Sequence, residues 1–231
     1  MLSVKDVCVN YGKSRIVTDV SFQVDNSEKM VVIGRNGVGK TTLMKSIIGI
    51  LPLQEGSVGL DGENLSKLRP DQRALKGIAY VPQGREIISQ CTVRENLHLG
   101  ALAFTKDYEE KMGEILEYFP ALVKHMDRKG GVLSGGLQQQ LAIARALMST
   151  PKALILDEPT EGIQPNVVEE IAEILVRYHK QYQIPMIVVE QNLKFAKRMA
   201  DKFVIIQKGS VVASGKIEEL SDELVDKYLT V

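Results

Sequence analysis

The stretch MVVIGRNGVGKTT, residues 30–42, decides the fold class because a glycine-rich loop in it joins a buried strand to a helix. Its first four residues form an apolar run, which is typical of a parallel strand that is buried on both faces. The rest matches the phosphate-loop pattern G-x-x-x-x-G-K-[ST], in which backbone N–H groups surround a phosphate. The stretch therefore predicts a nucleotide site made by Gly34, Arg35, Asn36, Gly37, Val38, Gly39, Lys40 and Thr41.

Lys40 and Thr41 carry the chemistry of this loop. A lysine at this place can reach the β- and γ-phosphates, and the threonine hydroxyl can hold Mg²⁺. The alternative is a plain glycine turn between a strand and a helix. That alternative would bury Lys40 without a partner, so the nucleotide site is favoured.

The stretch ALILDEP, residues 153–159, places two acids at the end of a second buried strand. Ligands of parallel α/β sheets bind at the carboxyl ends of the strands. Asp157 is suited to steady Mg²⁺ through water, and Glu158 is suited to polarise the attacking water as a general base. Strands that end in solvated acids are common, and this motif gains its weight from the phosphate loop expected on the same sheet.

The remaining sequence shows three patterns around these two strands. Residues 1–29 and 53–82 are typical of short strands and turns, and EGSVGLDGE, residues 55–63, is typical of a hairpin. Residues 86–148 follow a mainly helical pattern. Beyond Pro151, strands and helices alternate, which predicts a parallel sheet with right-handed crossovers.

These patterns predict an α/β protein with a nucleotide core, an antiparallel β-subdomain and a helical insert. The chain is expected to be a single domain of residues 1–231. The core and β-subdomain take residues 1–85 and 151–231, and the insert takes about residues 86–150. The elements expected beyond the insert are strands at 153–156, 186–190 and 203–207, helices at 166–179, 193–200 and about 217–229, and a hairpin at Lys208-Gly209.

The composition limits the partners of the chain. Among 231 residues, 29 are Lys or Arg and 29 are Asp or Glu, so the formal charge is zero and gives no electrostatic case for nucleic acid. Cys8 and Cys91 lack C-x-x-C spacing and fit reduced thiols. The sequence shows no signal-peptide pattern and no apolar run near the ~20 residues that cross a bilayer. Any role at a membrane is therefore expected to pass through a partner protein.

A second anion site is predicted by VLSGGLQQQLAIARAL, residues 132–147. Ser134 is a good N-cap for the amphipathic helix that follows, and Gly135 and Gly136 leave its first N–H groups bare. An ordinary capped helix inside the insert is the alternative. Two glycines at a helix start cost stability unless the backbone must approach something, so the anion site is favoured.

Together these motifs resemble the ATP-binding subunits of ABC transporters and cover nearly the whole chain in the expected order. The resemblance rests on residues 34–42 as the Walker A loop, Tyr11 as the adenine-stacking aromatic, Gln83 in VPQGR followed by TVRENL as the Q-loop, Ser134, Gly135 and Gly136 as the signature, and LILDEP as Walker B. A tyrosine that ends a strand is also common as simple packing, and a glutamine after a proline is also common on a surface loop.

The resemblance implies a P-loop NTPase core of the RecA-like type that hydrolyses ATP with Mg²⁺. Thr41, Gln83 and Asp157 are the residues it implies for the metal. It also implies head-to-tail pairing, in which the signature of one subunit covers the γ-phosphate held by the Walker A loop of the other. The γ-phosphate then supplies the contact that stabilises the closed pair, and hydrolysis removes it.

Three positions depart from the pattern of the family. Leu137 stands where the signature usually ends in glutamine, Gln164 replaces the aspartate of the D-loop, and Gln191 in VVEQN replaces the switch histidine. A glutamine amide can donate a hydrogen bond to a γ-phosphate oxygen but cannot shuttle a proton. Gln191 is therefore expected in the catalytic site beside Glu158, which is left as the only obvious base.

The departures resemble one branch of the family. EGIQP and VEQN are similar to the ATPases of branched-chain amino acid importers and their urea-type relatives, and DEPTEGIQP with the ending KYLTV favours the urea-type second ATPase subunit. The resemblance implies that ATP hydrolysis by the chain drives uptake of a small polar solute. The solute is expected to be urea, with branched-chain amino acids as the alternative. A soluble ABC ATPase on ribosomes or nucleic acid is less favoured, because such proteins usually carry two cassettes or a long coiled coil. A small-molecule kinase would not explain the signature helix.

The resemblance also implies the partners. They are a second ATP-binding subunit, either a paralogue or a second copy of this chain, transmembrane permease subunits and, indirectly, an extracytoplasmic solute-binding protein. The chain is then peripheral on the cytoplasmic face of a bacterial inner or plasma membrane. Residues 85–100 are expected to meet the permease, through a groove lined by Ile87, Ile88, Leu97 and Leu99, unless these side chains are core of the insert.

Overall fold

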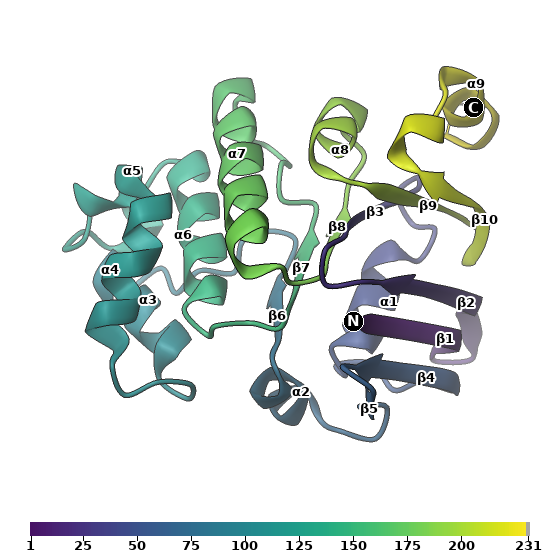
Figure 1. Ribbon diagram of the computed structural model, residues 1–231, viewed down its shortest axis with the longest axis horizontal. Helices are drawn as coiled ribbons and strands as arrows, with labels where there is room; N and C mark the ends of the chain where they lie inside the picture. The colour runs from purple at the N-terminus through teal and green to yellow at the C-terminus, as the bar shows by residue number, and fades with distance from the viewer. Residues whose placement is uncertain (230–231) are drawn as a thin grey trace.

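The computed structural model describes residues 1–229 and arranges them as two sheets with helices on their faces (Figure 1). The strands are β1 (Leu2–Tyr11), β2 (Ser14–Val24), β3 (Lys29–Ile33), β4 (Glu55–Leu60), β5 (Glu63–Asn64), β6 (Ile78–Val81), β7 (Ala153–Asp157), β8 (Met186–Val189), β9 (Lys202–Gln207) and β10 (Ser210–Lys216). The helices are α1 (Lys40–Ile47), α2 (Pro70–Lys76), α3 (Val93–Ala101), α4 (Tyr108–Tyr118), α5 (Pro120–Val123), α6 (Gly135–Leu147), α7 (Pro165–Tyr182), α8 (Leu193–Met199) and α9 (Asp222–Leu229), with short 3₁₀ turns η1 (Gly130–Val132) and η2 (Ile217–Glu219).

The larger sheet has the strand order β10-β9-β3-β8-β7-β6 within the described residues. All its neighbouring strands are parallel except the β9–β10 hairpin, whose turn holds Lys208 and Gly209. Strands β3, β7 and β8 are almost entirely buried, as their continuous apolar runs predict. This order aligns the carboxyl ends of β3, β8, β7 and β6 along one edge, where a ligand of such a sheet binds.

The smaller sheet is antiparallel, with the order β2-β1-β4-β5. Its β4–β5 hairpin is the one expected from residues 55–63. The sheet packs with helix α1 against one face of the larger sheet, and the two share one apolar cluster that includes Val9, Leu43 and Ile155. The expected combination of a parallel core with an antiparallel β-subdomain is confirmed.

The helices between β6 and β7 gather at the end of the molecule away from β1, β2 and β4 (Figure 1). A second apolar cluster joins α3, α4 and α6 to the other face of the larger sheet, through side chains such as Leu97, Ile115 and Leu141 that are fully buried. A short connection, residues 148–152, joins α6 to β7, and the shared apolar cluster holds the helical region to the core.

Two expected elements differ from the structure. The region 53–82 was expected to hold only strands and turns, yet it contains helix α2, which begins with Pro70 at its first turn and ends at Gly77 with a φ of 111°. Pro suits the first turn of a helix and Gly its left-handed end. The expected final helix 217–229 is divided, because Ser221 accepts a hydrogen bond from Leu224 N–H and starts α9 anew after η2. The last two residues of the ending KYLTV lie outside the described residues.

None of the helices within residues 1–229 combines the length and the apolar character that a membrane crossing requires.

Candidate functional site

The phosphate loop folds around the side chain of Lys40. The Lys40 side chain is only 4% exposed, and its ammonium group donates to the carbonyl oxygens of Gly34 at 2.7 Å and Arg35 at 3.0 Å. It also lies 3.4 Å from Oε1 of Glu158, which comes from the end of β7. Gly37 and Gly39 have φ values of 79° and 107°, a region that strains residues with a Cβ. The loop is thus a preformed concave backbone with a cation at its centre.

A cleft of about 600 Å³ opens in front of this loop. Tyr11 stands at it with 71% of its surface exposed, so this side chain is not core packing. The lining residues come from the two sheets, the phosphate loop and the ends of β6 and β7: Tyr11, Ser14, Ile16, Asn36, Gly37, Gly39, Lys40, Thr41, Thr42, Gln83 and Glu158.

Three residues of the predicted nucleotide set do not line the cleft with their side chains. Arg35 points away from it and donates from Nε to the carbonyl oxygen of Leu229, at the end of α9, at 3.0 Å. Val38 packs against the apolar cluster beneath the smaller sheet. Gly34 fits against the backbone of β9, where a Cβ would come within 2.6 Å of the Ile206 oxygen. These three contribute backbone shape rather than side-chain chemistry.

Asp157 is buried at the end of β7, with 1% of its surface exposed. Its Oδ2 accepts a hydrogen bond of 3.1 Å from the hydroxyl of Tyr80, and its Oδ1 has no hydrogen-bond partner among the described residues. Burial raises the pKa of this carboxyl, and the nearby hydroxyls of Thr41 and Tyr80 and the charge of Lys40 lower it in part. A buried carboxylate oxygen without a partner, close to a threonine hydroxyl, fits the hard oxygen ligands that Mg²⁺ takes.

Glu158, at the end of β7, contacts residues that follow β3, β6 and β8. Its φ of 49° turns the chain away from β7. Nε2 of Gln191, after β8, donates to Oε1 of Glu158 at 2.8 Å and also to Oδ1 of Asn36 at 2.7 Å. Nε2 of Gln83, after β6, donates to Oε2 of Glu158 at 3.2 Å. The structure therefore brings together the predicted residues Glu158, Gln191, Gln83, Asn36 and Lys40.

The signature residues lie apart from this cleft, at the start of α6. Ser134 caps the helix by accepting a hydrogen bond of 3.4 Å from Leu137 N–H. The Leu137 side chain packs on the second apolar cluster, which joins α3, α4 and α6 to the larger sheet. Neither glycine tolerates a side chain freely: a Cβ at Gly135 would lie 3.0 Å from the Arg85 guanidinium, and one at Gly136 would lie 2.9 Å from Val167. Close packing within the chain is thus one reason for the glycines.

Gln164, at the D-loop position, is the exposed residue that precedes α7, and its side chain makes no capping hydrogen bond with that helix. Neither it nor the signature residues line the cleft.

The structure adds a buried acid that the sequence analysis did not single out. Glu190 is 3% exposed, and its carboxylate accepts from the amide and hydroxyl of Thr160 and from the amides of Gln191 and Asn192. Burial raises the pKa of this carboxyl, and the donors oppose that effect. An acid directly after the apolar run of β8 was the available signal. Glu190 ties the segment after Glu158 to the loop that carries Gln191.

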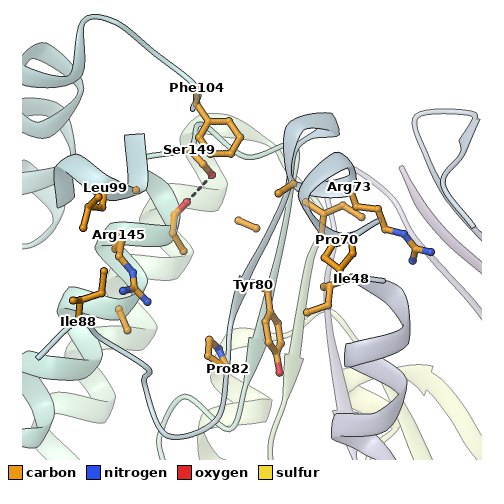
Figure 2. A pocket seen from close by; sticks show the side chains of 16 residues that line it. Ile48, Pro70, Arg73, Tyr80, Pro82, Ile88, Leu99, Phe104, Arg145 and Ser149 are labelled. Atoms are coloured by element: carbon orange, nitrogen blue, oxygen red, sulfur yellow. Dashed lines mark hydrogen bonds between the residues drawn. The ribbon is translucent and has the colours of Figure 1, made fainter. Parts of the chain in front are cut away.

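A groove of about 430 Å³ lies between the larger sheet and the helices α3 and α6 (Figure 2). Ile88 and Leu99 line it and are 40% and 44% exposed, whereas Leu97 is fully buried and Ile87 packs on the core. Two of the four side chains expected in a groove are therefore in it, and two are core. The remaining labelled walls include Ile48, Arg73, Tyr80, Pro82, Phe104 and Arg145.

The chain is similar to known ATP-binding transport proteins. The family model described as ABC transporter matches residues 17–161. The high-affinity branched-chain amino acid transport ATP-binding protein BraG of Pseudomonas aeruginosa is 40% identical, over 92% of this chain and 91% of BraG. The probable branched-chain amino acid transport ATP-binding protein LivF of Archaeoglobus fulgidus is 34% identical, over 95% of this chain and 94% of LivF.

A solved structure has the same architecture. The ADP conformation of MJ1267, an ATP-binding cassette of an ABC transporter, superposes with a TM-score of 0.89 and 28% identity, over 98% of this chain and 97% of MJ1267. The family match covers the phosphate loop and both carboxylates, and the relatives cover nearly the whole chain. This chain belongs to the ABC transporter family and is one of its ATPase subunits.

Proposed function

We propose that the chain is the ATP-hydrolysing subunit of an importer for branched-chain amino acids. The observation that carries the choice of solute is the 40% identity to BraG, a branched-chain amino acid transport protein, over nearly all of both chains. LivF, a second relative, has the same solute class in its name. The comparisons thus favour the alternative of the sequence analysis over urea, for which they offer no support.

The proposed chemistry uses the strand ends described above. Lys40 holds the β- and γ-phosphates, and Tyr11 stacks on the adenine at the rim of the cleft. Glu158 accepts a proton from the attacking water, and Gln191 and Gln83 hold its carboxylate in place through their amides. Thr41, Asp157 and Gln83 would hold Mg²⁺, which would neutralise charge on the phosphates when bound. Each of these groups is positioned by a rigid strand or the phosphate loop, which is what catalysis by orientation requires.

The signature site is proposed to act on a second subunit, as the family resemblance implies. Ser134, Gly135 and Gly136 begin a helix of 13 residues, so amide donors and the helix dipole favour an anion at this end. The site lies outside the chain's own cleft. A second cassette, a paralogue or another copy, therefore supplies the γ-phosphate that the signature contacts. Gln164, which is exposed, can hydrogen-bond across the same interface.

The groove is proposed to receive a helix of the permease, which would hold the chain at the cytoplasmic face of the membrane. Its walls offer Ile88, Leu99 and Phe104, each at least 38% exposed, beside the guanidinium of Arg145. An apolar strip with a charged rim suits an amphipathic helix. Such an importer receives its solute from an extracytoplasmic binding protein, which this chain does not itself contact.

Solute uptake by intact cells tests this proposal. Host cells that lack the chain are expected to lose high-affinity uptake of radiolabelled leucine and to keep uptake of urea, and the wild-type chain restores the leucine uptake. Leu99→Asp, which places a charge in the apolar groove, is expected to restore less than a tenth of it. The purified variant retains ATP binding, since Leu99 lies outside the cleft. Loss of urea uptake alone, or recovery of the chain with ribosomes, would contradict the proposal.

Gln191→His is expected to leave the affinity for ATP within about threefold of the wild type. An imidazole N–H can donate one of the two hydrogen bonds that the Gln191 amide makes, to Glu158 or to Asn36. Isothermal titration with a non-hydrolysable ATP analogue measures the effect. A loss of more than about tenfold in affinity would show that Gln191 supports the nucleotide pocket itself rather than the catalytic carboxylate.

A further inference from the structure

Tyr80 connects the groove with the carboxylate of Asp157. In the sheet, Tyr80 of β6 pairs with Ile155 of β7, and Asp157 lies two residues beyond Ile155. Side chains two residues apart on a strand share a face, so Tyr80 and Asp157 lie on the same side of the sheet. The tyrosine side chain is long enough to reach Asp157, which lies diagonally across from Tyr80 on the neighbouring strand. Its hydroxyl donates to Oδ2 of Asp157 at 3.1 Å.

The ring of the same tyrosine is part of the groove wall. Figure 2 shows it between Ile48 and Pro82, with the hydroxyl directed away from Phe104 at the far side of the groove. One rigid side chain therefore contacts the space proposed for a permease helix and the carboxylate proposed for the metal. A planar ring cannot bend, so a displacement at one end is transmitted to the other.

The hydroxyl of Tyr80 is a permanent donor. A tyrosine hydroxyl carries its proton at neutral pH, and Oδ2 of Asp157 is the acceptor that it reaches. Its hydrogen bond occupies Oδ2 and leaves Oδ1 as the buried oxygen without a partner. A ligand carboxylate that is hydrogen-bonded through its other oxygen has a fixed orientation, and partners of this kind tune metal affinity.

We propose that Tyr80 is a positioning residue through which a helix seated in the groove sets the orientation of Asp157, and with it the affinity of the site for Mg²⁺. The inference rests on the proposed function for the metal and for the occupant of the groove. It adds a route from the permease to the metal site that does not pass through Gln83. A helix that presses on the ring shifts the hydroxyl, and Oδ2 moves with it.

Tyr80→Phe tests the link, because it keeps the ring in the groove and removes only the hydrogen bond. Binding of a fluorescent ATP analogue to the purified full chain is followed as Mg²⁺ is added. The variant is expected to need about tenfold more Mg²⁺ for half-maximal binding, whereas its melting temperature stays within a few degrees of the wild type. Tyr108→Phe is the matched control, because Tyr108 stacks on His98 in the helical region, and it should behave as the wild type.

The second arm repeats the titration with the chain bound to its permease subunits. The Mg²⁺ requirement of the wild type is expected to differ between the free and the permease-bound chain by at least threefold, and Tyr80→Phe should abolish that difference. An unchanged Mg²⁺ requirement in Tyr80→Phe, or a difference that persists in the variant, overturns the inference. Failure of the wild type to bind Mg-ATP or the permease would instead overturn the proposed function.

Discussion

Glu158→Gln is expected to lower the rate of ATP hydrolysis by about 10²–10⁴-fold, the range that a positioned general base contributes. Glutamine has the same shape and can still accept hydrogen bonds, but its amide cannot take a proton from water. The carbonyl oxygen of the new amide can still accept from Gln191, and its NH2 group can donate to the side-chain oxygen of Gln83 once that amide turns over, so the pocket should retain its form. Nucleotide affinity is expected to change little, and the decrease should appear in kcat.

The same variant is expected to accumulate as an ATP-bound dimer, because ATP that is not hydrolysed keeps the contact between the two proposed subunits. Size-exclusion chromatography with Mg-ATP measures the dimer, and release of inorganic phosphate measures the rate. Glu173→Gln is the matched control, since Glu173 pairs with Arg198 on the exposed surface of α7. Hydrolysis by Glu158→Gln at more than a tenth of the wild-type rate would mean that another group takes the proton.

The phosphate loop and the carboxylates could be predicted from the sequence because their chemistry is local. The loop pattern fixes the number of residues between Gly34 and Thr41. Asp157 and Glu158 directly follow a run of apolar residues. Parallel strands then bring their carboxyl ends to one edge whatever the order of the other strands. The sequence alone therefore implies that Lys40 and Glu158 lie close together.

Other contacts depend on the pairing of strands, which no local sequence pattern determines. Tyr80 meets Asp157 only because β6 lies beside β7 in a particular register, and Arg35 turns from the cleft to bond Leu229, far along the chain. Strand order and register are properties of the whole sheet. Sequence motifs consequently identified the residues proposed to contact the nucleotide and missed Tyr80 and Glu190, which hydrogen-bond to Asp157 and to the amide of Gln191.

In the groove, helical periodicity separates side chains that are close in the sequence. Leu97 and Leu99 both lie on α3 but are two positions apart, which is about 200° around a helix with 3.6 residues per turn. They cannot face the same space, and the structure buries one and exposes the other at the groove. The apolar residues of this segment had to be divided between core and surface.

Lys40→Ala is expected to reduce the affinity for ATP by at least about 100-fold. Lys40 is buried and is already held by the carbonyls of Gly34 and Arg35, so its charge is fixed before the nucleotide arrives and little ordering cost remains. Hydrogen bonds to charged groups contribute about 1.5–3 kcal/mol each, and two phosphates would lose them. Since 1.4 kcal/mol is a tenfold change in affinity, the loss of two such contacts exceeds two orders of magnitude.

Isothermal titration with a non-hydrolysable ATP analogue measures this loss, and Lys45→Ala on the same helix α1 is the matched control, because it removes an equal charge outside the cleft. Removal of the Lys40 cation also leaves the Glu158 carboxylate without its nearest positive charge. The melting temperature of the variant must therefore be recorded with the titration, so that unfolding is not mistaken for weak binding. If folded Lys40→Ala bound ATP as tightly as Lys45→Ala does, the loop would not be the phosphate site, and its glycines would be nothing more than a turn between β3 and α1.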